Sequence, residues 1–324
     1  MTTTVTQEKT YKLSDLINYY ETCNRAEGKS LRTITWYSEN LARFHGYLKS
    51  RHLPDSVDDI DIKLLRDYVL CLMKRRRFEN HPYTSPSTEP LSTSTIHGHV
   101  RTLRAFFNWL AREGFIGSSA AKELRPPKVV QKVVSTLSDE EILSVLRMFS
   151  PGNNSEMRNQ TIFMVLLDTG LRIGELVSLQ MDNANMIEGL LKVMGKGKKE
   201  RIVPVGNKAQ KALQRYIFRN RPNPAHSGIE NVFLSVHGTP LTENSVKLIF
   251  ARLARRSGVS RLHAHLCRHT FATRFLINGG DVFTLQQILG HSTLEMVRRY
   301  VNLASNHVAL QHQKFSPLDR LNLR

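Results

Sequence analysis

Cysteine is scarce in this chain: three occur among 324 residues, and no two of them form a CxxC pair. This scarcity argues against a framework of disulfide bonds and against a cysteine-rich zinc site. No apolar run reaches the length of a membrane span, and residues 1–11 are polar, without the apolar centre of a signal peptide. We therefore expect a cytoplasmic protein with no membrane partner.

Acidic residues are also under-represented. The 28 Asp and Glu residues stand against 46 Lys and Arg, which gives a formal net charge of +18. Such an excess favours a polyanionic partner, because Lys and Arg displace the counterions of a phosphate backbone; a basic ribosomal or surface protein has the same balance. Residues 1–136 carry a net charge of +7 and the remainder +11. Both halves are thus predicted to contact nucleic acid.

The length suggests about two domains. Apolar residues recur at helical spacing in four stretches of residues 1–116: residues 14–23, a run that begins at Ser30, a run capped by Asp61, and a run from about Ser94 to Gly114. We predict a small helical bundle that binds DNA. Four basic residues at 74–77 would either grip phosphates or form a solvated helix end, and the sequence favours neither.

Residues 117–136 contain two prolines and several basic side chains, as expected of a linker. Ser138 and Glu141 then form a capping box, the sign of a new helix, and residues 137–305 are predicted to form a second domain of mixed structure. Residues 306–324 are too apolar for a free end, so we expect this tail to dock on a neighbouring protomer.

Two β-prone segments, residues 190–194 and 202–205, flank a turn rich in Gly and Lys, which predicts a hairpin in the second domain. Helices are expected at residues 160–168, 173–179, 208–219, 243–257 and 266–277. The predicted fold class is therefore mainly α with a small β-sheet or hairpin.

Several short patterns can carry chemistry. His265 and Arg268 are three residues apart, so both can face one anion from the same side of a helix; a surface His beside a salt-bridged Arg has the same spacing. Arg172 follows Gly170 at the start of an apolar helix, and Glu175 is placed to orient it. An ordinary Arg–Glu helix pair would look the same.

Gly290 suits the end of a helix, and Ser292 with Glu295 forms a second capping box, which starts a short helix with Tyr300 near its far end. His291 is therefore expected on the turn. On one continuous helix, a nine-residue separation would point His291 and Tyr300 in opposite directions, and the predicted break removes that constraint.

The combination is more specific than its parts. In chain order occur TGLRIGEL from Thr169, GKGKKER from Gly195, HLCRHTFAT from His265, LGHS from Leu289, and a tyrosine nine residues after His291. In this order and spacing the blocks resemble the tyrosine recombinase family of integrases, in particular its two-domain Xer-like members. The resemblance extends over nearly the whole chain and is weakest in residues 306–324. It implies a core-binding bundle followed by a mixed α/β catalytic domain.

The resemblance also implies site residues. Arg172 and Arg268 would hold the scissile phosphate, and Lys196 on the hairpin would be the general acid for the departing 5′ hydroxyl. Planar guanidinium groups match the non-bridging oxygens on which phosphoryl transfer concentrates charge. Paired arginines replace the divalent ion of many nucleases, so we expect no metal and no other cofactor.

Tyr300 would be the nucleophile, and His265 and His291 would contact the phosphate and manage protons. The role of His291 is the least fixed, because some family members have Lys or Trp there. Attack by tyrosine leaves a 3′-phosphotyrosyl ester, which preserves the bond energy for rejoining without ATP. By the resemblance, four protomers, identical or of two kinds, would assemble on two DNA sites, each closing its two domains around duplex DNA.

Other residues receive structural interpretations. Cys267 is expected to be a buried small hydrophobic residue, and no metal role is expected for His263 and His269. The aromatic residues at 106, 107 and 109 should lie in the bundle core. The hairpin residues Lys198, Lys199 and Arg201 would contact phosphates or solvate the hairpin.

The expected function is site-specific DNA recombination, whether integration, excision or dimer resolution. One alternative is strand relaxation of the type IB topoisomerase kind, which uses the same phosphotyrosine chemistry. A catalytically silent DNA-binding protein on the same scaffold is a second alternative, and a metal-dependent nuclease is a third.

Overall fold

The structure is a computed structural model of the full chain. It describes residues 11–79, 85, 87–128, 135–195, 199–291, 293–301, 312 and 316. The chain divides into two compact units, Met1–Gln131 and Lys132–Arg324, which are described separately below.

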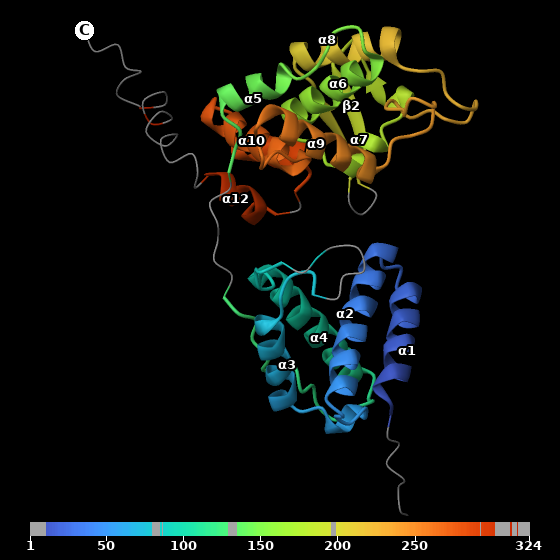
Figure 1. The fold of residues 1–324 in the computed structure, drawn as a ribbon, viewed down its shortest axis with the longest axis vertical. Coiled ribbons are helices and arrows are strands. Elements are labelled where there is room, and N and C mark those ends of the chain that lie inside the picture. The colour runs from blue at the N-terminus through green and yellow to red at the C-terminus, as the bar shows by residue number, and fades with distance from the viewer. Residues whose placement is uncertain are drawn as a thin grey trace, which may run out of the picture. The chain divides into compact units, whose positions relative to one another are not determined.

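The described part of the first unit is a bundle of four α-helices, drawn in blue to teal in Figure 1: α1 (Leu13–Ala26), α2 (Leu31–Ser50), α3 (Ile62–Lys74) and α4 (Thr93–Arg112). The predicted caps are present. The Ser30 side chain accepts from Thr33 N at 3.3 Å, and Asp61 Oδ1 accepts from Leu64 N at 2.8 Å, so each satisfies a backbone donor that the first turn leaves free.

Aromatic side chains fill the centre of this bundle. Phe106, Phe107 and Trp109 of α4 are all buried, as predicted. The core continues past Ile116, because Ala121 and Leu124 belong to the same buried cluster. The packed part of the first unit therefore includes residues that the sequence placed in the linker.

The second unit contains a small antiparallel sheet among helices (Figure 1). Its described strands are β1 (Ala184–Asn185), β2 (Leu190–Met194) and β3 (Glu200–Pro204), in the order β1-β2-β3. Its described α-helices are α5 (Asp139–Leu146), α6 (Asn154–Thr169), α7 (Ile173–Val177), α8 (Asn207–Arg215), α9 (Glu243–Ser257), α10 (Ala264–Ile277), α11 (Val282–Leu289) and α12 (Glu295–Val301).

The predicted fold class is confirmed: the chain is mainly α-helical with one small sheet, and β2 pairs with β3 as the expected hairpin. The Ser138–Glu141 capping box opens α5. Helix α6 begins six residues earlier than expected, because Asn153 caps it by accepting from Ser155 N and Glu156 N. A short π-helix, Tyr216–Asn220, continues α8.

Helices α6 and α10 pack against each other, and both contribute buried residues to the core of the second unit. Cys267 is fully buried there, as predicted, among apolar side chains such as Phe163 and Leu266. Because α10 is held in this core, the polar residues on its other faces are placed rigidly against α11 and α12, which pack beside it.

Candidate active site

The turn between α6 and α7 places Arg172. Gly170 ends α6 with φ +63°, and a Cβ there would lie 2.6 Å from Phe271 Cδ1, so only glycine fits this turn. Arg172 N donates to Glu175 Oε2, and Arg172 Nη1 donates to Glu175 Oε1, each at 2.9 Å. The predicted orientation of Arg172 by Glu175 is confirmed.

Arg268 comes from α10 and is almost entirely buried, with 1% of its surface exposed. It donates to the Gly170 carbonyl at 2.6 Å and to the Leu289 carbonyl at 2.8 Å. Burial, together with the nearby Arg172 charge, lowers the pKa of Arg268 to about 10. The group therefore stays charged at neutral pH, and its positive charge is little screened by water.

Arg201 of β3 also enters the site, which corrects the expectation that it contacts phosphates or solvates the hairpin. Its two Nη atoms donate to the two carboxylate oxygens of Glu175, both at 2.8 Å. Burial by itself would raise the pKa of the Glu175 carboxyl, but the hydrogen bonds from Arg201 and Arg172 outweigh it and lower that pKa. Glu175 is thus an ionised carboxylate between two arginines.

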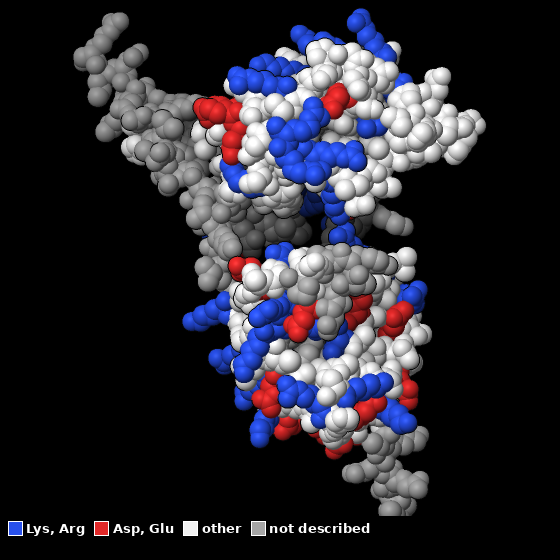
Figure 2. Space-filling view, viewed as in Figure 1, with Lys and Arg blue, Asp and Glu red and all other residues white. Residues whose placement is uncertain are grey.

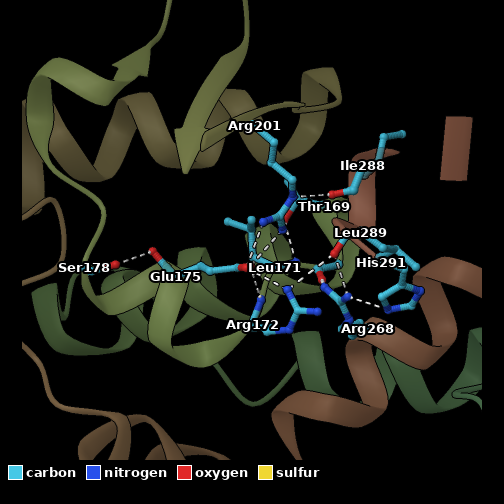
Figure 3. A network of polar contacts seen from close by, with 11 residues as sticks. Thr169, Leu171, Arg172, Glu175, Ser178, Arg201, Arg268, Ile288, Leu289 and His291 are labelled. Carbon is cyan, nitrogen blue, oxygen red and sulfur yellow. Dashed lines mark hydrogen bonds and ion pairs between the residues drawn. The ribbon is translucent and has the colours of Figure 1, made fainter. Parts of the chain in front are cut away.

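The C-terminus of α11 is where these side chains meet (Figure 3). Arg201 Nε donates to the Ile288 carbonyl at 2.8 Å, and Arg172 Nη1 reaches the Leu289 carbonyl, which Arg268 also holds, at 3.4 Å. The last carbonyls of a helix have no partner within the helix and carry the negative end of its dipole. Three guanidinium groups from three other elements therefore converge on this helix end.

His291 follows directly after this helix end, on the turn, as predicted. Its Nε2 lies 2.8 Å from Arg268 Nη2, and because arginine can only donate, Nε2 must accept. Burial and the charges of Arg268, Arg172 and Arg201 lower the pKa of His291 to about 4, so the ring is neutral at physiological pH. Its Nδ1 is buried and has no hydrogen-bond partner among the described residues.

His265 lies one turn before Arg268 on α10. Partial burial and the nearby Arg268 charge lower the pKa of His265 as well. Its ring stands edge-on to that of His269, with the ring centres 4.4 Å apart. The structure thus places His265 close enough to Arg268 and Arg172 for both positive charges to disfavour its protonation.

Tyr300 of α12 is buried, with 4% of its surface exposed, in an apolar cluster that includes Leu285 and Leu289. Its hydroxyl lies 2.9 Å from His269 Nδ1. His269 was assigned no site role from the sequence. The signal that points to it is its spacing: it is four residues after His265, and therefore on the same face of α10.

Lys196 and Ser292 lie outside the described residues, so the hairpin lysine and the second capping box cannot be placed. The same holds for the tail at 306–324, apart from positions 312 and 316. The strands on either side of Lys196 are described, and Gly195 N donates to the Lys199 carbonyl at 2.8 Å, which closes the base of the loop.

Basic side chains gather on the surface of each unit. In the second unit, Figure 2 shows Lys and Arg close together over α9, which carries Lys247, Arg252 and Arg255 as exposed residues. In the first unit, Arg43, Lys74 and Arg75 line a groove of about 540 Å³ beside Tyr68. Both surfaces suit a polyanion.

The described residues contain no group of three or more His, Cys, Asp or Glu side chains that could hold a metal ion. Within the same part of the chain, no helix is both long and apolar enough to span a bilayer.

Comparison with known proteins adds independent evidence. The model of the phage integrase family matches residues 135–307. Tyrosine recombinase XerD of Staphylococcus haemolyticus is 28% identical over 293 residues, which cover 90% of this chain and 94% of that protein.

Two solved structures are similar in fold. The Tn1549 transposon integrase in complex with transposon right end DNA is 20% identical, with a TM-score of 0.72 over 94% of this chain and 100% of that one. The XerH site-specific recombinase bound to a palindromic difH substrate is 20% identical, with a TM-score of 0.68 over 94% of this chain and 85% of that one.

Proposed function

The chain belongs to the phage integrase family, and from that premise we propose that it is a tyrosine-type site-specific recombinase whose nucleophile is Tyr300. One observation carries the assignment of the site. Arg172 and Arg268, from different elements, meet at the Leu289 carbonyl beside His291, and Tyr300 lies on the helix that follows. This convergence of positive charge supports the proposal that a scissile phosphate binds here.

Arg172 and Arg268 are the groups that bind the non-bridging oxygens of this phosphate. The Arg172 side chain is 35% exposed, so it can meet DNA that arrives from solvent. Arg268 contributes a buried and fixed charge. Guanidinium groups held in advance by Glu175 and by backbone carbonyls need little reorganisation when charge develops in the transition state.

Tyr300 must lose its proton to attack, because only about 0.1% of an unperturbed tyrosine is phenolate at neutral pH. The imidazoles of His265 and His269 lie next to each other on α10, and His269 contacts the hydroxyl directly. A histidine in that place can accept the proton while positive charge from Arg268 favours the phenolate. The product is a 3′-phosphotyrosyl ester and a free 5′ hydroxyl.

The departing 5′ oxygen needs a proton in turn. Lys196 is our candidate for the general acid, since it belongs to the loop between β2 and β3, and β3 is tied to Glu175 through Arg201. His291, which is neutral and hydrogen-bonded to Arg268, is assigned to holding that arginine and the phosphate.

The partner is double-stranded DNA, contacted by the helical unit predicted at residues 1–116 and by the catalytic unit of residues 137–305. The basic segment of residues 117–136 joins them, and its first part, with Ala121 and Leu124, packs on the helical unit. Complete strand exchange needs four cleavages, so we propose four protomers on two DNA sites. The tail at 306–324 would join neighbouring protomers, and the cytoplasm is the expected compartment.

The test is covalent capture on DNA. The chain first selects a binding site from a randomised duplex pool, and a nicked version of that duplex then traps the cleaved state. We expect a protein–DNA adduct on a denaturing gel in the presence of EDTA, and none with Tyr300→Phe. An adduct that survives this substitution would assign the nucleophile elsewhere, and specific binding without any adduct would support a silent DNA-binding protein.

A further inference from the structure

The side chain of Arg201 joins three elements of the catalytic unit. It leaves β3, pairs through both Nη atoms with Glu175 of α7, and donates from Nε to the Ile288 carbonyl at the end of α11 (Figure 3). Only 11% of the side chain is exposed. A charged group this well covered is costly unless every polar atom is matched, and the contacts of Arg201 supply that match.

Both partners of Arg201 contact or adjoin the side chains that we propose bind the DNA phosphate. Glu175 bonds the backbone and the guanidinium of Arg172, each at 2.9 Å. The residue after Ile288 is Leu289, whose carbonyl accepts from Arg268, and His291 follows two residues later. Arg201 therefore acts on the phosphate-binding groups indirectly, through Glu175 and the end of α11.

The chain makes room for this side chain at Gly290. A Cβ at that position would lie 3.0 Å from Arg201 Cδ and 3.1 Å from its Nε and Nη1. Gly290 also has φ +61°, which a residue with a Cβ rarely adopts. The turn that carries His291 and the path of Arg201 are thus fitted to each other.

Arg201 is also part of the hairpin itself. It pairs with Val193 in the β2–β3 register, and the loop that contains Lys196 starts two residues after Val193. A shift of Arg201 would move the strand that leads into this loop, so the side chain links the hairpin to the arginine pair.

We propose that Arg201 is a positioning residue for DNA cleavage, which sets Arg172 through Glu175 and sets His291 through the end of α11. This inference rests on the proposed function. The role requires arginine, because a lysine ammonium is a compact charge that cannot present the planar fork needed by a carboxylate and still reach a carbonyl on a second element.

The experiment compares Arg201→Lys with Arg221→Lys. Arg221 is a fair control, because it is a partly buried arginine of the same unit that also donates to backbone carbonyls, those of Val232 at 3.0 Å and Asn231 at 2.8 Å. The rate of adduct formation is measured in a single turnover, with the dissociation constant for the duplex and the melting temperature measured alongside. We expect cleavage by Arg201→Lys to be about 100-fold slower than by Arg221→Lys, the scale of a misplacement near 1 Å, at similar affinity and at a temperature well below the melting temperature of both variants.

A second substrate tests the route. A methylphosphonate at the scissile position replaces one charged non-bridging oxygen by a methyl group, so it depends less on a well-placed Arg172. We expect the deficit of Arg201→Lys to shrink at least tenfold on this substrate. Equal deficits on both substrates, or a rate equal to that of Arg221→Lys, would overturn the inference. Absence of a Tyr300-dependent adduct from the unaltered chain would instead overturn the proposed function.

Discussion

The hydroxyl of Tyr300 and Nδ1 of His269 lie 2.9 Å apart and come from two different helices, α12 and α10. A histidine in direct contact with the attacking oxygen can take up its proton. We expect His269→Phe, which keeps a ring but cannot accept a proton, to slow adduct formation on the nicked duplex by about 100-fold.

The matched control is His263→Phe. His263 is an exposed histidine at the start of the same helix, and its ring contacts only the backbone of Arg261 among the contacts described. We expect this variant to cleave at the unaltered rate. If His269→Phe cleaves as fast as His263→Phe, the contact with Tyr300 plays no part in proton transfer.

A glycine at the end of α6 should be indispensable for the stability of the catalytic unit. Gly170 combines φ +63° with a site where a Cβ would lie 2.6 Å from Phe271 Cδ1 and 2.9 Å from Leu289 Cδ2. We expect Gly170→Ala to lower the free energy of unfolding by about 3 kcal/mol, as backbone strain and overpacking add. Urea unfolding followed by circular dichroism measures the change.

Gly258→Ala separates these two causes. Gly258 ends α9 with φ +75°, but nothing lies within 4 Å of its Cβ position, so that substitution introduces the backbone strain alone, about 1 kcal/mol. Equal losses in the two variants would show that Phe271 and Leu289 move aside without cost.

The helices and their caps were predictable because they depend on local chemistry. Ser30, Asp61 and Ser138 each precede an apolar run of helical period, and each accepts from a backbone N–H of the first turn. The hairpin was equally predictable, from its β-prone segments. Residue spacing of this kind requires no knowledge of the tertiary fold.

The contacts that Arg201 and His269 make within the site were not predictable, for a physical reason. Arg201 and His269 act through contacts with Glu175 and Tyr300, which are 26 and 31 residues away in the chain. Arg201 belongs to a basic hairpin, where a solvated side chain is the ordinary outcome, and nothing local reveals that β3 turns it inward. Pairings over such distances are decided by the packing of α7, α10 and α12.

The helical bundle of the first unit should lose stability in mild acid. Burial, with the nearby Arg43 and Arg75 charges, lowers the pKa of His99 to about 4, whereas a histidine in an unfolded chain titrates near 6.5. Between these values the unfolded state binds a proton that the folded state does not. The stability supplied by this group is therefore complete above about pH 6.5 and falls as the pH decreases towards 4.

Tryptophan fluorescence isolates this effect, because both tryptophans of the chain, Trp36 and Trp109, lie in the first unit. We expect the urea midpoint to fall between pH 7 and pH 4.5 in the unaltered chain, and to fall less in His99→Gln. His97→Gln, a change at a half-buried histidine on the same helix, should keep the full dependence. The same pH dependence in both variants would mean that other groups govern acid unfolding.

The exposed basic residues of α9 predict how the affinity for DNA depends on salt concentration. Each phosphate neutralised by Lys or Arg adds close to one unit to the slope of log affinity against log salt concentration. The double substitution Arg252→Gln with Arg255→Gln should therefore reduce that slope by about 2. Lys208→Gln with Lys211→Gln removes the same net charge from exposed positions on α8. If proximity to DNA matters rather than net charge, this second pair leaves the slope almost unchanged.

Filter binding of the selected duplex between 50 and 200 mM salt, a range over which about 10³-fold changes in affinity are common, distinguishes an effect of proximity from an effect of net charge. Equal slopes for both double variants would show that α9 does not lie along the DNA backbone.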